Sequence, residues 1–220
     1  VLDDASTAYS NPAAMTRLER GMVSGGGTVI SPIVKMDDTG TTFDFNGPGA
    51  GGVAALGGND GGNPYRPKVV PALAIAWPFM DGRVWGGLSI NAPFGLGNKY
   101  NEDWFGRYDS IETHLKTINI SPTAAFRITD TLAIGGGIDI QYADATLRAA
   151  VSNIASEGES SLEGDDWSYG YNIGLHYTPI PSTVIGAHYR SEMRHELKGR
   201  IAVQSLSSGN FDASGTADLN

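Results

Sequence analysis

The fold is decided by the stretch Trp167-Ser168-Tyr169-Gly170-Tyr171-Asn172-Ile173-Gly174-Leu175-His176-Tyr177-Thr178, whose side chains alternate in character at every step. Successive side chains of a β-strand point to opposite faces of its sheet. One face of this stretch carries only aromatic and aliphatic residues, and the other carries small and polar ones. The alternation predicts a strand that lies between an apolar and a polar environment.

The same alternation recurs along the chain, whereas helical periodicity is nearly absent. Strands are predicted over residues 21–34, 68–78, 83–92, 111–127, 132–148, 167–178 and 183–204. In the last of these, one face carries His188, Arg190, Glu192, Arg194 and Glu196. Alternating charges on one barrel face are typical of a salt-bridge ladder along a lumen wall, because lumen walls tolerate charge.

The connections between the predicted strands alternate in length. Short links lie at 80–82, 129–131 and 180–182, and long ones lie at about 35–67, 93–110 and 150–166. Short turns on one side and long loops on the other are expected of an outer-membrane barrel, whose tilted strands cross the bilayer in about ten residues. Aromatic residues lie near the strand ends, as a membrane-interface girdle requires: Trp77, Phe79, Phe126, Tyr142, Trp167, Tyr169, Tyr177 and Tyr189.

The alternative fold is a soluble antiparallel β-sandwich, whose strands also alternate. Two features favour the barrel. The polar face is rich in Gly and Ser, which suits a crowded aqueous lumen, and the apolar face is aromatic at its ends, whereas a sandwich core places bulk in the middle. We therefore predict an all-β chain that forms a transmembrane antiparallel β-barrel. Seven strands are an odd number, whereas bacterial single-chain barrels usually have an even one, so we expect the C-terminal half of the barrel to be missing.

Composition excludes several other classes. The 220 residues contain no Cys, which rules out disulfide scaffolds and Cys-ligated metal sites. The net charge of -9 argues against a nucleic-acid surface, which needs clustered Lys and Arg. The four His show no metal-ligand spacing, and no nucleophile is accompanied by a base. No cofactor, metal or enzymatic activity is predicted.

Residues 1–20 do not alternate and form a separate N-terminal segment before the predicted barrel of residues 21–220. Asn11-Pro12-Ala13 is a turn signal, and Pro12 is suited to open a short helix over 14–19. Such a segment lies either in the periplasm or inside the lumen as a plug.

The 93–110 loop is rich in aromatic residues, among them Trp104, Phe105 and Tyr108. Exposed apolar patches usually mark binding sites. The alternative is that these rings only pack the loop onto the rim of the barrel.

Three separated motifs resemble the FadL-type outer-membrane transporters of long-chain fatty acids and aromatic hydrocarbons. The segment from Asp3 to Met15 is similar to the N-terminal hatch of that family. Asn91 to Leu96, Tyr100, and Asp103 to Tyr108 resemble its third strand and third extracellular loop, and Tyr189-Arg190-Ser191-Glu192 followed by Lys198-Gly199 resembles its seventh strand.

The resemblance implies a fourteen-stranded barrel, of which this chain holds the hatch and the first seven strands. It implies passive uptake of hydrophobic compounds across the bacterial outer membrane: capture in a groove between two extracellular loops, transfer to a tighter lumenal site, and hatch-gated lateral release beside a kinked third strand. The expected surroundings are outer-membrane lipid and lipopolysaccharide, and the expected state is a monomer.

The implied site residues fall into three groups. The groove residues are Phe94, Leu96, Tyr100, Trp104, Phe105 and Tyr108, opposed by Ile154 and Leu162 from a short acidic loop at 150–166. The hatch residues are Asn11, Pro12 and Met15, and the strand-three bend falls to Gly86, Gly87 and Pro93, since Gly and Pro weaken ladder pairing.

Arg148 is the candidate partner for a ligand carboxylate. It shares its parity with Leu132 and Ile140, which counts against a lumenal position unless a bulge shifts the register. The alternative is a rim arginine that faces lipid headgroups. Two other functions stay open: a structural or adhesive barrel without transport, and a lipid hydrolase, which would need a Ser–His pair at the lumen edge.

Overall fold

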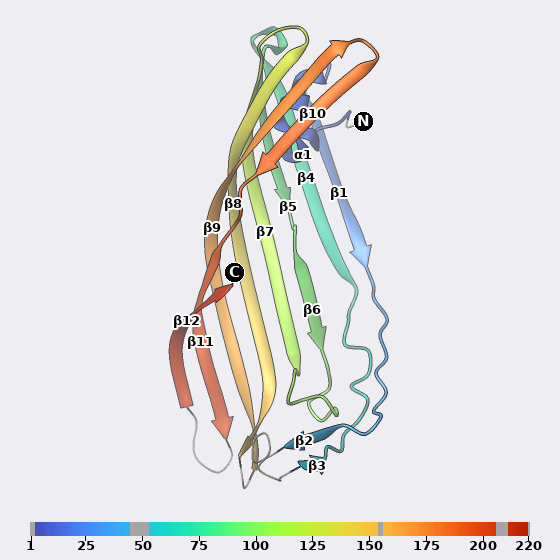
Figure 1. Cartoon of the computed structure of the whole chain (residues 1–220), viewed down its shortest axis with the longest axis vertical. Helices are drawn as coiled ribbons and strands as arrows, with labels where there is room; N and C mark the ends of the chain where they lie inside the picture. Colours follow the sequence, from blue (N-terminus) through green and yellow to red (C-terminus); the bar gives the residue numbers. More distant parts are fainter. Residues whose placement is uncertain (1–2, 45–52, 154–155, 206–210, 220) are drawn as a thin grey trace.

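The computed structural model of the chain describes residues 3–44, 53–153, 156–205 and 211–219, and it is built almost entirely of long antiparallel strands (Figure 1). The helical elements are α1 (Thr7–Ser10), η1 (Pro12–Arg17) and η2 (Met80–Gly82). The strands are β1 (Met22–Ile30), β2 (Thr42–Asp44), β3 (Val53–Ala55), β4 (Lys68–Phe79), β5 (Val84–Asn91), β6 (Gly95–Lys99), β7 (Glu112–Arg127), β8 (Leu132–Asn153), β9 (Ser156–Ile180), β10 (Thr183–Arg190), β11 (His195–Ser205) and β12 (Phe211–Leu219). Over the described residues, no helix has the length and apolar character needed to cross a membrane.

One curved sheet contains most of these strands, in the order β1-β4-β5-β7-β8-β9-β11-β12. β6 pairs with β7, and β10 pairs with β9, while β2 and β3 form a separate hairpin. The short turns lie at the upper end of the sheet in Figure 1, and the long connections with β2 and β3 lie at the lower end. The structure confirms an all-β antiparallel fold with a short helical N-terminal segment.

The two faces of the sheet have opposite character. The outer face is apolar and exposed: Tyr169 is 69% exposed, Ile173 56% and Trp77 54%. The inner face carries small and polar side chains that are buried, including Ser121, Asp139 and Asn172. An exposed apolar outer face combined with a polar inner face is the inverse of a sandwich core and matches a lipid-facing wall.

Residues 150–166 differ from expectation, since most of them are strand rather than loop. β8 and β9 pair without a register shift from Leu132↔Tyr177 to Asn153↔Ser156. The alternation of apolar and polar side chains weakens in residues 150–166. Both faces of the sheet lie beyond the apolar band here, so neither face needs apolar side chains. Leu162 is therefore a strand residue opposite Leu147, and Ile154 lies outside the described residues.

The predicted strand 183–204 is interrupted at 191–194 and forms β10 and β11. Between the pairs Arg190↔Asn172 and Lys198↔Asp165 this chain segment advances eight residues (198 − 190) while β9 advances seven (172 − 165). The extra residue exchanges the two faces. The expected lumenal ladder of five charges is therefore wrong: Arg190 faces the lumen, whereas Glu192 and Arg194 are highly exposed and pair with each other at 3.2 Å. β12, which pairs with β11, is a further strand that sequence alternation did not predict.

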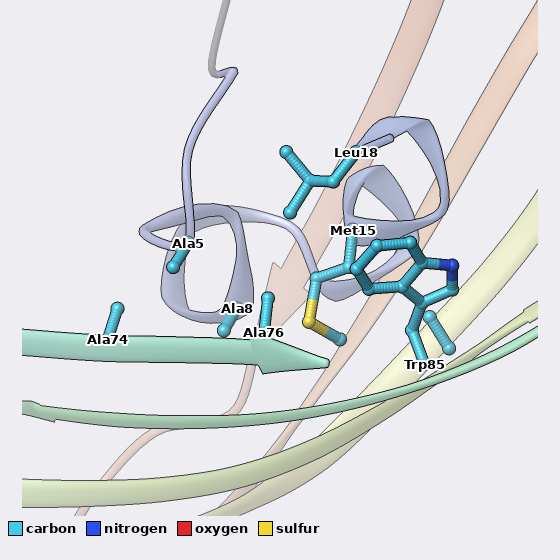
Figure 2. Close-up of a cluster of buried hydrophobic side chains, with 8 residues drawn as sticks. Ala5, Ala8, Met15, Leu18, Ala74, Ala76 and Trp85 are labelled. Carbon is cyan, nitrogen blue, oxygen red and sulfur yellow. The ribbon is translucent and has the colours of Figure 1, made fainter. Parts of the chain in front are cut away.

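The N-terminal segment packs against the inner face of the sheet near the short turns (Figures 1 and 2). Pro12 occupies the first turn of η1, and the Asn11 side chain caps it by accepting a hydrogen bond from the Ala13 N–H at 3.2 Å. Met15 and Leu18 pack with Trp85 of β5, which is 1% exposed. The segment, called the hatch below, lies on the inner face of the sheet, and Trp85 is its largest apolar contact.

Close approach of the hatch depends on glycines in the sheet. A Cβ on Gly135 would lie 2.6 Å from the Ala13 nitrogen, and one on Gly87 would lie 2.6 Å from the Met15 sulfur. A Cβ on Gly174 would overlap the Asn11 side-chain oxygen. Asn11 uses this space to donate from Nδ2 to the carbonyls of Leu175 and Ala187, at 3.1 and 3.3 Å.

We expect Gly135→Ala to loosen the hatch, because the new Cβ would meet main-chain atoms of Pro12 and Ala13 that cannot rotate away. Overpacking of this kind costs about 1–3 kcal/mol. Limited proteolysis of the folded protein should then cleave residues 1–20 faster than in the unmodified protein. Gly26→Ala is the matched control, since its Cβ would meet no atom within 4 Å. Equal cleavage of the two variants would contradict the proposed packing.

Candidate functional site

The third strand of the sheet is broken where the sequence reads Ala92-Pro93-Phe94. β5 and β6 both pair with β7, but between Asn91↔Asn119 and Gly95↔Lys116 the broken strand advances four residues (95 − 91) and β7 advances three (119 − 116). Pro93 has no N–H to donate. Phe94 bridges the break by donating its N–H to Thr117 Oγ1 at 3.0 Å and accepting from the Thr117 N–H at 3.0 Å.

The two predicted bend glycines lie away from this break. Gly86 and Gly87 are in the regularly paired part of β5, opposite Trp77 and Ala76. Gly87 faces Met15 and Ala8 of the hatch. Of the three residues, Pro93 is the one in the interruption.

A cavity of about 580 Å³ lies on the inner face beside the break. Its walls come from the hatch, from the strand-three break, from β7 and β8, and from the second interruption at 191–194. The lining residues are Tyr9, Pro93, Phe94, Leu115, Thr117, Asn119, Asp139, Gln141, Ala143, Arg190, Ser191, Met193 and His195. The cavity is thus amphipathic, with apolar side chains toward the long loops and polar ones toward the hatch.

Asp139 is the centre of the polar part. Its side chain is 1% exposed and accepts hydrogen bonds from Asn119 Nδ2 at 3.1 Å, from Asn172 Nδ2 at 3.0 Å, and from the Ser121 hydroxyl. Arg190 Nε donates to Asp139 Oδ2 at 3.1 Å. A buried carboxylate is tolerated when it is paired and fully hydrogen-bonded, as this one is.

Arg190 also holds the hatch. Its second guanidinium nitrogen donates to the Tyr9 carbonyl at 2.9 Å, and its Cζ lies 3.9 Å from the centre of the Tyr9 ring. A cation over an aromatic face is attracted by the ring quadrupole. We call Asp139, Arg190 and Tyr9 the hatch latch, because they join the sheet to α1.

Most of the aromatic residues of the 93–110 loop form a core of the loop itself. Tyr100 and Trp104 stack with centroids 3.8 Å apart and planes 8° apart, and both are buried. Trp104 Nε1 donates to the Ser110 carbonyl at 2.8 Å. Phe105 contacts Trp104 at 5.1 Å, and Tyr108 stacks on Phe43 at 4.2 Å. Tyr100 and Trp104 therefore pack the loop rather than line an open groove.

The partner segment of this loop core lies at 57–64 and was not identified from sequence. A Cβ on Gly61 would lie 2.7 Å from the Tyr100 ring, and one on Gly58 would lie 2.5 Å from the Asp103 carbonyl oxygen. Asn59 bonds both Asp103 and the main chain of Phe105. The aromatic rings of the loop can approach this segment only because it contains glycines. Those glycines were the one feature of the sequence that could have indicated the contact.

The remaining predicted groove residues do not lie together. Phe94 is 62% exposed and lines the lumenal cavity, apart from the loop core. Leu96 lies in β6 opposite Leu115. Leu162 shares an inner-face row with Leu147 and Ile201, its cross-strand partners. Among the predicted groove residues whose side chains the structure describes, Phe94 lines the cavity and Leu162 lies half-buried on the inner face.

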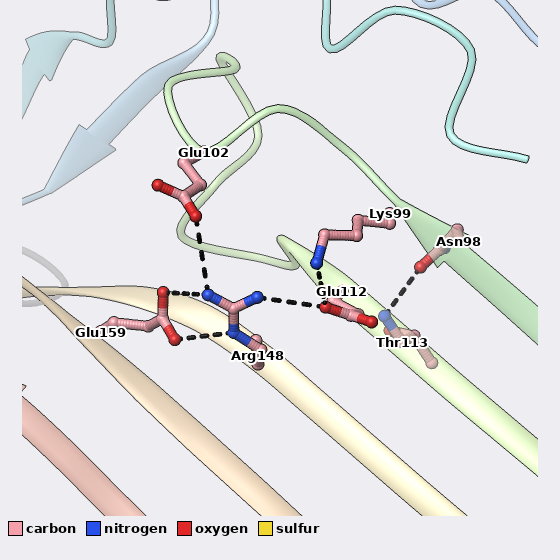
Figure 3. A network of polar contacts seen from close by, with 7 residues as sticks. All are labelled: Asn98, Lys99, Glu102, Glu112, Thr113, Arg148 and Glu159. Atoms are coloured by element: carbon pink, nitrogen blue, oxygen red, sulfur yellow. Dashed lines mark hydrogen bonds and ion pairs between the residues drawn. The ribbon is translucent and has the colours of Figure 1, made fainter.

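Arg148 lies in an ion-pair cluster on the outer face, at the loop end of β8 (Figure 3). The register from β7 to β9 has no bulge, so Arg148 keeps the outward parity of Ile140. It donates to Glu159 at 2.6 and 2.7 Å and to Glu112 at 3.1 Å. Burial raises the pKa of the Glu112 carboxyl, but hydrogen bonds from Lys99 and Arg148 outweigh burial and hold the pKa below its ordinary value. In the described residues, no group of His, Asp and Glu is arranged to hold a metal ion.

Comparisons with known proteins agree with this architecture. A family model described as outer membrane protein transport protein (OMPP1/FadL/TodX) matches residues 1–220. The long-chain fatty acid transport protein of Escherichia coli O6:H1 is 28% identical over 222 residues, which cover 90% of this chain and 47% of that protein. Outer membrane protein P1 of Haemophilus influenzae is 24% identical, over 92% of this chain and 51% of that protein.

Two solved structures share the fold. A FadL homologue of Pseudomonas aeruginosa superposes with a TM-score of 0.83 at 22% identity, over 99% of this chain and 59% of that one. The Ralstonia pickettii toluene transporter TbuX gives a TM-score of 0.67 at 21% identity, over 96% and 58%. The chain spans about half the length of the relatives it matches in sequence. It is an outer-membrane protein and belongs to the outer membrane protein transport protein (OMPP1/FadL/TodX) family.

Proposed function

We propose that this protein takes up hydrophobic compounds passively across the outer membrane. The compound enters from the extracellular side, binds in the lumenal cavity, and leaves sideways beside the break in strand three when the hatch moves. The observation that carries the proposal is that one cavity touches both the hatch, through Tyr9, and the break, through Pro93 and Phe94.

The break supplies a weak place in the wall. β4 pairs with β5 only as far as Ala72↔Asn91, and within the described residues no ladder joins β4 to β6. Because β4 and β6 share no ladder hydrogen bonds, they can separate from each other without losing any. Phe94 lies at this point and is exposed, so it suits contact with a passing apolar chain.

The energetics require a release step. Burial of an alkyl chain contributes about 0.8 kcal/mol per methylene, less the cost of ordering it. A site that captures a long chain this tightly releases it slowly unless its walls change. The hatch latch is the contact whose opening would change them, because Arg190 joins the sheet to Tyr9.

The relatives act on two chemical classes of ligand. By their names, the Escherichia coli relative is a transporter of long-chain fatty acids, and TbuX is a transporter of toluene. A carboxylate that reached the cavity would meet Arg190, which lines it. Arg148, on the outer face, would not meet it. We therefore assign the role of carboxylate partner to Arg190 in place of Arg148.

The proposal is tested by uptake of radiolabelled oleate and toluene in a deletion strain, with and without the complete protein. We expect uptake of at least one compound to rise when the protein is present. Equal uptake of both compounds would overturn the proposal and favour a structural or adhesive barrel.

We expect Arg190→Met to release Tyr9 and weaken oleate binding. The loss of a charge-assisted hydrogen bond to a ligand carboxylate corresponds to about a tenfold or larger rise in the oleate Kd. Toluene uptake should not fall, because toluene has no charge for Arg190 to pair. Arg66→Met is the matched control, since Arg66 is exposed in the long 35–67 connection and does not line the cavity. An unchanged oleate Kd in Arg190→Met would refute the assignment.

Arg148→Met should leave the oleate Kd unchanged but lower the thermal stability at neutral pH, since it removes the cation shared by Glu112 and Glu159. A partly exposed cluster of this kind contributes about 1 kcal/mol. A lowered carboxyl pKa stabilises the fold above the group's unfolded value, and that contribution is lost as the pH falls through the lowered value. The difference in melting temperature between the variant and the unmodified protein should therefore shrink in acid. A pH-independent difference would contradict this reading.

A further inference from the structure

The lumenal cavity ends at two broken strands, of which the proposed function uses one. The continuous strands β7 and β8 form its floor, the break at Ala92–Phe94 borders it on one side, and the interruption at 191–194 borders it on the other. The two breaks lie in the same cross-strand row of the sheet. Thr117, which bridges the first break, pairs with Ala143, and Ala143 pairs with Asp166, where the second break begins.

The second break leaves part of β9 without ladder partners on one side. The β9–β10 register ends at Asn172↔Arg190, and the β9–β11 register begins at Asp165↔Lys198. Between these two pairs, few hydrogen bonds join β9 to the segment 191–196. The Ser191 N–H donates to the Tyr171 carbonyl at 2.9 Å, the Ser191 hydroxyl accepts from the Tyr171 N–H, and the Glu196 N–H donates to the Asp166 carboxylate at 3.0 Å.

Side chains fill the space that the ladder leaves. Ser191 and Met193 both line the cavity and both lie over Gly170 of β9. A Cβ on Gly170 would lie 2.5 Å from the Met193 sulfur and 2.6 Å from the Ser191 hydroxyl oxygen. Methionine has three rotatable bonds and adapts to irregular gaps. The part of the break over Gly170 is therefore closed by a flexible side chain lying on a glycine, and movement of that side chain would break no ladder hydrogen bond.

The outer side of the break faces the part of the apolar band nearest the long loops. Trp167 and Tyr142 are cross-strand partners whose rings are 5.1 Å apart, and Tyr169 and Tyr171 follow on the same exposed face. Beyond this aromatic pair, toward the long loops, the outer face becomes charged, with Asp144 opposite Asp165. The exposed ion pair Glu192–Arg194 lies in the interruption, next to Ser191, whose N–H bonds the Tyr171 carbonyl. Aromatic rings next to charges are typical of the membrane–water interface.

We propose that the 191–194 break is a second lateral passage, sealed by Met193, through which single-chain amphiphiles pass between the cavity and the interfacial region of the outer leaflet. Its apolar walls are Met193 and the β9 aromatic residues, and its polar mouth is Glu192–Arg194. The inference rests on the proposed function for its ligand, but its geometry can be tested without transport.

The test uses the absence of Cys from this chain. Met193→Cys is introduced into the complete protein, labelled with bimane, and reconstituted in phosphatidylcholine vesicles with and without acyl-brominated lipid. Gln141→Cys is the control for a cavity position behind an unbroken strand, and Tyr169→Cys is the control for a lipid-facing position. We expect bromolipid to quench the Met193 label nearly as much as the Tyr169 label and several-fold more than the Gln141 label.

Quenching of the Met193 label no greater than that of the Gln141 label overturns the passage. Ser191→Cys gives the same readout if Met193→Cys fails to fold. The quenching measurement does not depend on whether the protein transports anything. A negative quenching result is therefore distinguishable from a failure of the proposed function.

A second measurement follows oleate transfer from vesicle membranes into the protein. Met193→Ala should speed the transfer by opening the seal, and Met193→Trp should slow it by filling the break. Met36→Ala and Met36→Trp, in the long loop, are matched controls that should change neither rate. Equal transfer rates for the two Met193 variants would likewise overturn the proposal.

Discussion

One constraint underlies the whole structure: a main chain that crosses lipid must form its hydrogen bonds within the sheet, because lipid offers none. β7, β8 and β9 meet it with unshifted registers over most of their length. The strands on either side of these three are interrupted, between β5 and β6 at 92–94 and between β10 and β11 at 191–194. A path through the described part of the wall would therefore lie at its broken strands, and both broken strands border the same cavity.

The ladder uses only the main chain, which leaves the inner side chains free to be small. Glycines at 87, 135 and 174 bring the hatch close enough for its own polar groups to reach the sheet. Asn11 bonds the carbonyls of Leu175 and Ala187, which are themselves ladder partners. The hatch thus rests partly on main-chain groups of the sheet, with Trp85 as its largest apolar contact, and such an interface allows movement more readily than an interlocked apolar core does.

Period-two alternation was sufficient to predict the two faces of the sheet, since lipid and lumen select opposite side chains at every step. It was insufficient beyond the membrane, where both faces of β8 and β9 meet water and nothing selects one over the other. It also missed the extra residue at 191–194, because Arg190, Glu192 and Arg194 continue to alternate across the register shift. The burial of Tyr100 and Trp104 depends on Gly58 and Gly61, and contacts between distant segments leave no periodic signal.

The arrangement of polarity in the cavity bears on what it can carry. Phe94, Leu115 and Met193 line one part, and Asp139 and Arg190 line the other. An uncharged hydrocarbon gains only from the first group, so its binding depends on apolar area alone. An amphiphile uses both groups: its chain lies along the apolar residues while its headgroup competes with Tyr9 for Arg190. Binding of an amphiphile would then weaken the contact that holds the hatch, whereas binding of a hydrocarbon would leave it intact. Under the proposed function, the same cavity would hold both ligand classes, and only the charged class would be coupled to the hatch through this latch.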